Sequence, residues 1–293
     1  MEVNDETQAE TTLKDIQCVA LDILLDFVRV CDSLKLTYYI SGGTYLGAIR
    51  HNGFIPWDDD VDVAMPRKDY DKLLSCGDDF FGKDYKLVHY SKQDDVIHYC
   101  AKLESSKYQL IDNTASVPRK VNIWIDIFPL DGMSDNAIVT KLHKLRLLSL
   151  RGLFKLSLFD KIVNQKNRNR PAYENVIIDI ARHANFSRFM NPYKRMQALD
   201  KALSKYDFYG SKKVMNFMGS YKFKSIMDRE NIYSDGAFYS FEGHMLRGPK
   251  NYDAYLRKIY GDYMKLPPLE ERNWHQTSIV DNTTGRFGIV GMD

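Results

Sequence analysis

The segment from Leu36 to Val63 constrains the fold more than any other part of the chain. Leu36 to Ile40 is short, apolar and aromatic, which predicts a β-strand. Gly42 and Gly43 interrupt that strand, and residues 45–51 then predict a short helix. The alternation of Asp60-Val61-Asp62-Val63 predicts a second strand. Strands and helices that alternate in this way indicate an α/β fold.

Other segments extend the same pattern. Apolar residues at three- and four-residue spacing predict an amphipathic helix over residues 12–33. A helix can begin at Asp69, after Pro66, and a further helix is expected over Tyr252 to Tyr260. Tyr99 to Leu103 and Val121 to Phe128 predict additional strands.

The composition changes once the chain has passed Gly132. Residues 136–220 are rich in Leu, Lys, Arg and Asn and show helical periodicity. No internal repeat or low-complexity linker separates the 293 residues into independent units. We therefore expect one domain over 1–293, with a core at about 12–135, a basic helical insert at about 136–220 and a return segment at about 221–293.

Charge and cysteine usage exclude several functional classes. With 41 basic and 39 acidic residues, the chain has no global field that would attract nucleic acid. The four cysteines form no C-x-x-C pair, which argues against a zinc ribbon and fits a reducing compartment. The acidic, polar start is unlike a secretory signal, and no apolar run reaches about 18 residues. We expect a cytoplasmic protein, which could touch the inner face of the membrane.

Four carboxylates fall within five residues: Asp58, Asp59, Asp60 and Asp62. They repel one another, and a hard divalent cation can offset that repulsion, since such ions prefer oxygen ligands. On a strand, Asp60 and Asp62 would share a face, roughly 6.5 to 7 Å apart, and the valines between them would face the core. Asp58 has the same parity, whereas Asp59 points away. The arrangement predicts a site for Mg²⁺ or Mn²⁺ with positions left for phosphate oxygens.

A third carboxylate fits this site. Ile123, Ile125 and Ile127 share one face of a predicted strand, and Asp126 is the lone charge on the other face. A lone buried carboxylate is costly unless it meets a cation. If this strand lies beside the strand of Asp60 and Asp62, three carboxylates converge.

The glycine corner completes the pattern. Gly42, Gly43 and Thr44 would present backbone N–H groups and a hydroxyl at a helix N-terminus, where anions bind well. A Gly-Gly pair alone is usually a turn, and an isolated acidic run is usually a solvated loop or a helix cap. Their conjunction favours a site that holds phosphate between metal and N–H donors.

These residues resemble a known family. The stretch Tyr39 to Arg67 resembles the signature of the LicD family, phosphocholine transferases that decorate bacterial surface polysaccharides, with fukutin and fukutin-related protein as relatives. Trp124 to Gly132, Phe241-Glu242-Gly243 and Tyr255 to Pro268 add to the resemblance, which spans about residues 35–275. It implies a nucleotidyltransferase-like core, a mixed sheet with flanking helices, plus a helical appendage.

The resemblance also implies a reaction. The donor would be CDP-choline or a related CDP-alcohol, and the acceptor a sugar hydroxyl on a glycan, a lipid-linked glycan, a lipopolysaccharide or a teichoic acid precursor. CMP would leave. Asp60, Asp62 and Asp126 would be the catalytic carboxylates, with Asp58 as a further metal ligand. Asp126 could hold metal or accept the proton of the acceptor hydroxyl.

Further substrate-binding residues are expected around this centre. Besides Gly42, Gly43 and Thr44, we expect Arg50 and Lys102 to contact phosphate, although an ordinary exposed Lys is an equal alternative for Lys102. Asp58 could instead orient Arg50. Glu242 lies in a family-like motif, and His275, near the end of the chain, fits a surface residue better than a ligand.

A trimethylammonium group has no hydrogen-bond donor, so its recognition would depend on aromatic faces and nearby carboxylates. Tyr38, Tyr39, Tyr45, Trp57 and Trp124 lie close to the motif in sequence. Core packing is the better interpretation for most of them, and none is assigned to choline.

Residues 141–159 predict a basic amphipathic helix. It could lie on an anionic membrane or hold an anionic polymer, while packing on the core with its charges in water is the favoured interpretation.

Other functions remain open from the residues alone. A glycosyltransferase with an Asp-x-Asp pair would use a nucleotide-sugar, and a nucleotidyltransferase would release pyrophosphate. A non-catalytic glycan- or cation-binding module would have no turnover at all.

Overall fold

The computed structural model describes residues 5–93, 96, 98–112, 119–158, 190–269, 272, 277–281 and 287–289. Its helical elements are α1 (Asp5–Leu34), α2 (Gly42–His51), α3 (Arg67–Ser75), η1 (Asp78–Phe80), α4 (Ala137–Ser157), α8 (Pro192–Leu203), η2 (Lys222–Ser225), α9 (Arg229–Ile232) and α10 (Tyr252–Tyr260). Its strands are β1 (Tyr39–Ile40), β2 (Asp62–Pro66), β3 (Tyr85–Val88), β4 (Ala101–Asp112), β5 (Arg119–Met133), β6 (Lys213–Met215), β7 (Met227–Asp228), β8 (Ala237–Phe241), β9 (His244–Gly248), β10 (Thr277–Asp281) and β11 (Phe287–Ile289).

The main sheet is mixed. Its central path runs β1-β2-β5-β4-β10-β11, with β3 paired to β4, and β6 joining β5 to β7. β2 and β5 pair in parallel, whereas β1, β4 and β6 pair antiparallel to their neighbours. β8 and β9 form a separate hairpin. The predicted α/β class, a mixed sheet with flanking helices, is confirmed.

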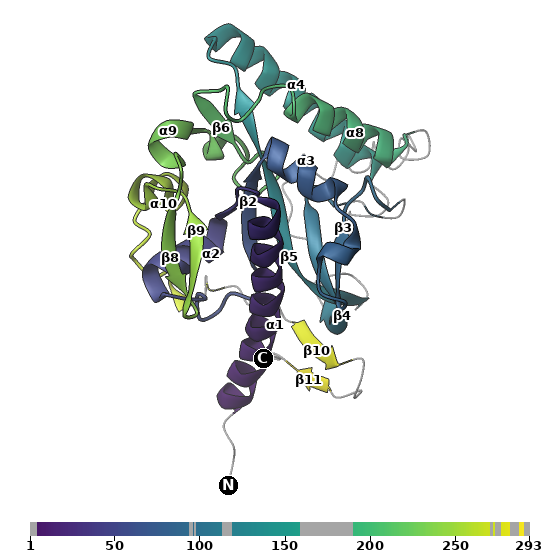
Figure 1. Cartoon of the computed structure of the whole chain (residues 1–293), viewed down its shortest axis with the longest axis vertical. Coiled ribbons are helices and arrows are strands. Elements are labelled where there is room, and N and C mark those ends of the chain that lie inside the picture. The colour runs from purple at the N-terminus through teal and green to yellow at the C-terminus, as the bar shows by residue number, and fades with distance from the viewer. Residues whose placement is uncertain are drawn as a thin grey trace, which may run out of the picture.

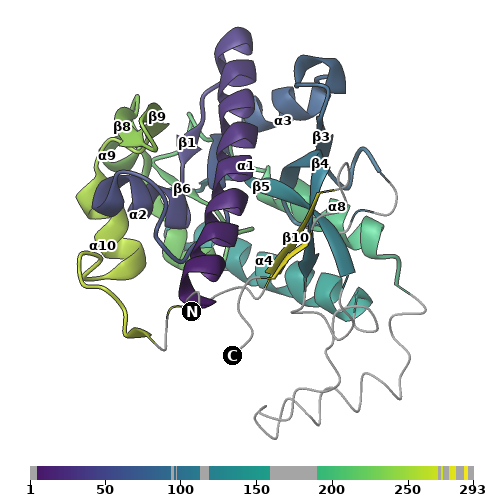
Figure 2. The ribbon, with the colours of Figure 1, turned by 90° about the horizontal axis from the view of Figure 1, so that it is seen from below.

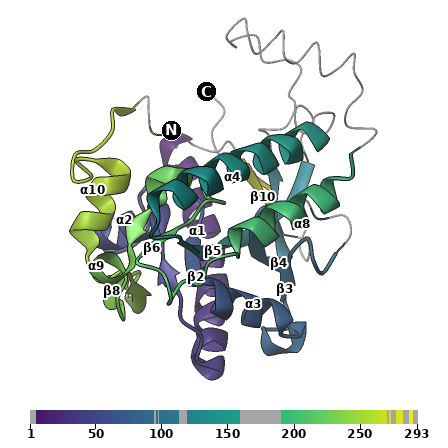
Figure 3. The same cartoon turned by 90° about the horizontal axis from the view of Figure 1, so that it is seen from above.

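Helices cover the two faces of the sheet. The long helix α1 crosses one face (Figures 1 and 2), where Ile16 and Phe27 pack in the same core as Ile123, Ile125 and Ile127 of β5. α4 and α8 lie side by side on the other side (Figure 3). They enclose a second apolar cluster with the end of β5 and with β6. The predicted alternation along β5 is therefore confirmed, because its isoleucines are fully buried against α1.

Some boundaries differ from the sequence prediction. α2 begins at Gly42, so the glycines belong to the first turn of the helix. β2 begins only at Asp62, so the expectation that Asp60 lies on the strand is wrong. β1 ends at Ile40, where the chain turns into α2, and it provides no further partner for the residues before Asp62. The segment expected to be helical also contains the strand β6, while residues 159–189 lie outside the described part.

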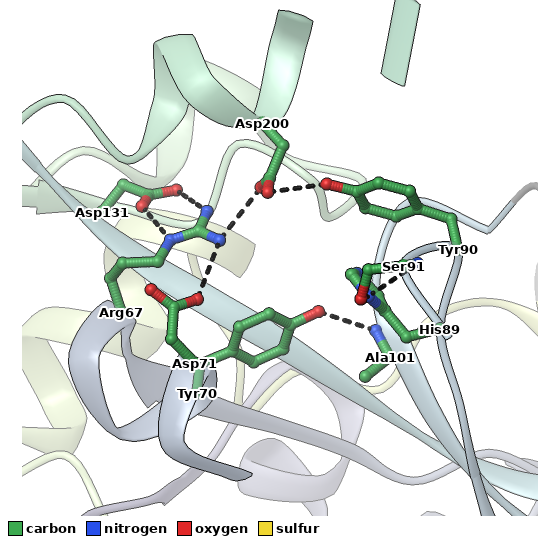
Figure 4. Close-up of polar contacts among 9 residues, drawn as sticks. All are labelled: Arg67, Tyr70, Asp71, His89, Tyr90, Ser91, Ala101, Asp131 and Asp200. Carbon is green, nitrogen blue, oxygen red and sulfur yellow. Dashed lines mark hydrogen bonds and ion pairs between the residues drawn. The ribbon is translucent and has the colours of Figure 1, made fainter. Parts of the chain in front are cut away.

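A buried charge network attaches α8 to the sheet (Figure 4). The guanidinium of Arg67 donates to both carboxylate oxygens of Asp131, at 2.7 and 2.9 Å, and to Asp200 of α8 at 3.0 Å. The hydroxyl of Tyr90 donates to the second oxygen of Asp200 at 2.8 Å. Burial alone would lower the pKa of Arg67, and the charge of Asp131 more than reverses this, so the pKa rises. The network holds α3, β5 and α8 together.

Candidate active site

Asp62 lies directly against the glycine corner. A Cβ atom on Gly42 would approach Oδ2 of Asp62 to 2.5 Å, and Gly42 itself has a φ of +54°. The backbone N–H of Asp62 donates to Oγ1 of Thr44 at 2.8 Å, and the N–H of Ser41 donates to the carbonyl oxygen of Asp62 at 3.0 Å. Thr44 therefore holds the backbone of Asp62, and its own hydroxyl hydrogen is still able to donate.

Asp58 lies at the same helix terminus. A Cβ atom on Gly43 would come within 2.5 Å of Oδ2 of Asp58. The main chain at Asp58 is secured by a bond to the carbonyl oxygen of Ile55 at 2.9 Å and by the side-chain amide of Gln17 at 2.8 Å. The first N–H groups of a helix have no partner within the helix, and a carboxylate is stabilised near them. The corner predicted to hold phosphate thus accommodates an anionic side chain in this structure.

The parallel pairing of β2 with β5 brings two carboxylates together. Asp62 is the register partner of Asp126, and the N–H of Asp126 donates to the carbonyl oxygen of Val61 at 2.9 Å. Val61 and Val63 are fully buried, so Asp62 faces away from the core of α1. The neighbouring strands expected from the sequence are present. Asp60 precedes β2 by two residues and contributes its charge from the connecting segment.

The pKa of Asp62 reflects its burial and the carboxylates around it. Burial raises the pKa of Asp62 well above its ordinary value. The negative charges of Asp60, Asp126 and Asp58 raise the pKa further, and Lys102 opposes them. Several carboxylates therefore act on one position, where a bound cation would relieve their repulsion.

Lys102 faces Asp126 from the other side. The two are register partners between β4 and β5, and Nζ of Lys102 lies 3.7 Å from Oδ1 of Asp126. The same Nζ is 3.6 Å from the ring centroid of Trp124. Cys100 donates through Sγ to Asp126 at 3.4 Å. Lys102 is thus a buried cation next to the carboxylates, not the exposed lysine of the alternative interpretation.

Whether these residues fit a divalent ion depends on the donor set and its spacing. Within the described ranges, no three His, Cys, Asp or Glu side chains stand together closely enough to hold an ion as they are. The donors that act on Asp62 are nevertheless all carboxylates, the ligands that Mg²⁺ and Mn²⁺ prefer, and their charges repel. The chemistry of the residues fits such an ion, and Asp62 and Asp126 are among the side chains that would hold it.

The structure adds a group that sequence reasoning missed. The hydroxyl of Tyr255 lies 3.0 Å from Oγ of Ser41 and accepts from the N–H of Gly42 at 3.3 Å. Tyr260 and Tyr221 lie close enough for the charge of Asp62 to act on them. Both Tyr255 and Tyr260 belong to the segment that carries the family resemblance, which is the signal that could have indicated them.

The aromatic residues singled out from the sequence have other roles. Tyr38, Tyr39 and Tyr45 are buried in the main core, which confirms the core-packing interpretation for them. Trp57 packs partly buried against that core, and the guanidinium carbon of Arg272 lies 4.3 Å from its ring centroid.

Arg50 stands at the far end of α2 from the glycine corner. It follows Gly42 by eight helical positions, about 12 Å along the axis. Its Nη1 donates to the carbonyl oxygen of Tyr263 at 2.8 Å. Burial lowers the pKa of Arg50, and the positive charge of Arg272 contributes to the decrease. In this structure Arg50 connects α2 to the segment after α10.

Glu242 makes a contact between distant segments. Its Oε1 accepts from the N–H of Phe54 at 3.0 Å, and its own N–H donates to the carbonyl oxygen of Asn52 at 2.9 Å. Glu242 lies in the turn between β8 and β9, where its backbone has a φ of +48°. Glu242 therefore ties this hairpin to the turn that leads into the acidic segment. His275 lies outside the described residues.

This contact predicts how variants of Glu242 behave. Glu242→Gln keeps an oxygen acceptor for Phe54, and we expect its thermal stability and activity to stay near those of the wild type. Glu242→Ala loses the acceptor and should destabilise by about 1–3 kcal/mol, since Phe54 N–H would be left unsatisfied. Thermal unfolding of both variants checks this. A Glu242→Gln protein that is stable but inactive would instead indicate that substrate needs the charge.

Comparison with known proteins supports the sequence resemblance. A family described as LicD/FKTN/FKRP, nucleotidyltransferase domain, matches residues 35–146. Over 274 residues the chain is 31% identical to the lipopolysaccharide cholinephosphotransferase LicD of Haemophilus influenzae, which covers 90% of this chain and 96% of that protein. Shorter stretches match uncharacterized proteins of Rickettsia typhi (36% over 55 residues, 19% of this chain and 18% of that protein) and Rickettsia prowazekii (50% over 35 residues, 12% and 13%). The matched family region contains the glycine corner, the acidic segment, Lys102 and Asp126.

Proposed function

The chain belongs to the LicD/FKTN/FKRP family, and from that premise we propose that it transfers phosphocholine, or a similar alcohol phosphate, from a CDP-alcohol to a sugar hydroxyl of a cell-surface glycan. The observation that carries this proposal is the pairing of Asp62 with Asp126 directly beside Gly42. It occurs in a chain that aligns over 90% of its length with a lipopolysaccharide cholinephosphotransferase.

The proposed reaction is a single displacement at phosphorus. The oxygen of the acceptor hydroxyl forms a bond to the phosphorus that carries the alcohol, and the bond from this phosphorus to the bridging oxygen breaks. CMP leaves with that electron pair, and Asp126 accepts the proton of the hydroxyl. Lys102 would offset negative charge on the transferring phosphate, and the N–H groups of Gly43 and Thr44 would orient its oxygens.

The carboxylates would also hold the metal. Asp58, Asp60, Asp62 and Asp126 are the residues that would bind Mg²⁺ or Mn²⁺, which when bound neutralises charge on phosphate oxygens. Support comes from the pKa of Asp62, which burial raises and which the charges of Asp60, Asp126 and Asp58 raise further. Binding of Mg²⁺ can be measured without turnover, as a rise in the unfolding temperature of the wild-type protein.

One assay separates the proposed reaction from its alternatives. The protein is incubated with Mg²⁺, a lipopolysaccharide or teichoic acid acceptor, and CDP-choline, CDP-ethanolamine, CDP-glycerol or CDP-ribitol in turn. We expect CMP together with acceptor that has gained the alcohol phosphate. Release of a nucleoside diphosphate from a nucleotide-sugar would favour a glycosyltransferase, and pyrophosphate from CTP would favour a nucleotidyltransferase. Binding of glycan without any product would favour a non-catalytic module.

We propose in addition that α4 contacts an anionic membrane surface, where a lipid-linked acceptor would be presented. His143, Leu147 and Phe154 pack inward, but the helix does not bury all of its apolar residues. Ile138, Leu142 and Leu145 share another face and are more than half exposed. These exposed apolar side chains favour contact of α4 with a membrane surface over the interpretation in which the solvent-facing side of α4 carries only charged residues. In the described part of the chain, no helix combines the length and apolarity that crossing a bilayer requires.

A liposome assay tests this contact. Lys141, Arg146 and Lys155 are exposed on α4, whereas Arg151 stacks between Tyr99 and Phe217 and is left unchanged. Replacing the three exposed residues with glutamate should reduce co-sedimentation with anionic vesicles at least about tenfold, since each basic residue contributes about 1 kcal/mol. Three comparable changes elsewhere, at the exposed Lys14, Lys72 and Lys250, serve as the control. Equal sedimentation of both triple variants, or none by the wild type at low salt, would contradict the proposal.

A further inference from the structure

If the proposed function holds, the donor carries a trimethylammonium group that the protein must distinguish from other alcohols. Such a group is cationic, yet it offers no N–H to donate. It is recognised by aromatic faces, and by carboxylates that stabilise its charge without a hydrogen bond. The subsite on which this inference depends should therefore combine accessible rings with the acidic centre.

Several aromatic residues near the motif already make other contacts. Nζ of Lys102 occupies a face of Trp124 at 3.6 Å, and Arg272 lies 4.3 Å from the centroid of Trp57. The tyrosines of β1 and of the first turns of α2 are buried. In the described part of the chain, each of these rings is therefore either buried or already in contact with a cation.

Tyr221 and Tyr260 differ from them. Their ring centroids are 5.6 Å apart and their planes make an angle of 80°, so the two rings form a corner. Tyr221 precedes η2 and is 36% exposed, while Tyr260 is the last residue of α10 and is partly buried. The ring of Tyr221 is thus accessible to solvent, whereas the ring of Tyr260 is packed into the protein.

The corner is anchored beside the carboxylates. Tyr255, five residues before Tyr260 on α10, contacts the glycine corner through its hydroxyl, which fixes α10 against the N-terminus of α2. η2 is fastened to the end of α10 because Nζ of Lys224 donates to the carbonyl oxygen of Ile259 at 2.6 Å. That Nζ lies 5.9 Å from the centroid of Tyr221, at the outer limit of a cation–π contact.

Charge links the two rings to the acidic centre. Burial raises the pKa of Tyr221, a hydrogen bond with Tyr260 opposes the rise, and the charges of Asp62 and Asp58 add to it. Burial likewise raises the pKa of Tyr260, with Tyr221, Tyr255 and Asp62 contributing in the same direction. The influence of Asp62 on both hydroxyl groups agrees with the contact of Tyr255 at Ser41 and Gly42, which ties α10 to the acidic centre.

We propose that Tyr221 and Tyr260 form a subsite for the quaternary ammonium group of the donor, with the two ring faces as the groups that recognise it. The subsite selects a trimethylammonium group over a primary ammonium group or a neutral polyol. A polyol gains no cation–π attraction, and a primary ammonium group is more strongly hydrated.

Calorimetric binding of CDP-choline and CDP-ethanolamine, which differ by three methyl groups, tests this subsite. We expect the wild type to bind CDP-choline more tightly, and Tyr221→Ala and Tyr260→Ala each to reduce that preference roughly tenfold. Tyr221→Phe, which keeps the ring face, should retain the preference. Tyr252→Ala is the matched control. Tyr252 is an exposed tyrosine on α10, the helix that also carries Tyr260, but its ring contacts Tyr239 instead of Tyr221.

The outcomes separate the subsite from the reaction. Wild-type protein that binds both donors equally, or alanine variants that unfold normally and keep the full preference, would overturn the subsite while CMP release could still proceed. A choline preference that depends on Tyr221, in a protein that releases no CMP, would overturn the reaction alone. If Tyr260→Ala fails to fold, the exposed Tyr221 carries the test by itself.

Discussion

Asp62→Asn will reduce CMP release from the preferred CDP-alcohol by roughly a thousandfold or more. The substitution keeps the size of the side chain and its position against Gly42, but it removes the carboxylate that joins the acidic segment to Asp126. Loss of one preorganised charged group at a phosphoryl-transfer centre commonly costs about 10²- to 10³-fold, and loss of a metal ligand adds to this.

The same substitution should not destabilise the protein. Because burial and three neighbouring carboxylates raise the pKa of Asp62, its ionised form opposes folding when no divalent ion is present. The folded state then holds the proton more tightly than the unfolded state, so this contribution favours folding at low pH and is lost as the pH rises above the ordinary pKa of aspartate. In EDTA, Asp62→Asn should therefore unfold at the same temperature as the wild type or higher, with the advantage larger at pH 8 than at pH 5.

Two controls accompany this prediction. Asp32→Asn changes an exposed carboxylate on α1 and should leave both turnover and the unfolding temperature unchanged. Addition of Mg²⁺ should raise the unfolding temperature of the wild type but not that of Asp62→Asn. Turnover that survives Asp62→Asn, or that continues in EDTA, would contradict the assignment of this centre.

Arg67→Met will lower the free energy of unfolding by about 3–5 kcal/mol. The substitution removes the cation from a network in which Asp131 is completely buried, and breaking a buried pair leaves an uncompensated charge. In proteins somewhat smaller than this one, a loss of about 1 kcal/mol lowers the unfolding temperature by roughly 2–4 °C. We therefore expect the unfolding temperature to fall by about 6–20 °C. Asp200 would lose its bond from Arg67 and keep only the bond from Tyr90, so we expect α8 to separate from the sheet first (Figure 4).

The pH dependence gives this effect a signature. Without Arg67, burial raises the pKa of the Asp131 carboxyl with nothing to oppose it, so the variant should be less destabilised at pH 4 than at pH 8. Lys68→Met is the matched control, because Lys68 is the next residue and its side chain is 69% exposed beside Asp207. We expect that control to change stability by less than about 1 kcal/mol. If both variants lost the same free energy of unfolding, the buried network would contribute no more to stability than an exposed ion pair.

Local pattern was sufficient for many parts of this protein. The helix near the N-terminus, the helix from Tyr252 to Tyr260 and the alternating face of β5 all follow from periodicity, because each depends on residues a few positions apart. The glycine corner and its acidic segment were recognisable for the same reason, since they form one continuous motif. The family resemblance rested on that motif and is confirmed by the comparison with LicD.

Contacts between distant segments were beyond this reasoning. Tyr255 meets Ser41 across 214 residues of sequence, and Glu242 meets Phe54 across 188. Arg50 is expected to contact phosphate because it lies in the motif, and this stays a prediction. Nothing in the sequence indicates that its guanidinium donates to the carbonyl oxygen of Tyr263, 213 residues away. Asp60 lies outside the strand because the pairing of β2 with β5 begins at Asp62, and the alternation of residues 60–63 does not indicate where pairing begins.

By itself, then, the amino-acid sequence determined the types of side chain at the centre, the strands that carry Asp62 and Asp126, and the family. Only the tertiary structure decided which of them meet: Asp62 with Asp126, Asp126 with Lys102, and Tyr255 with the glycine corner. The physical reason is range. Backbone sterics and side-chain periodicity act over a few residues, while strand pairing and helix packing join segments whose separation leaves no periodic trace in the chain.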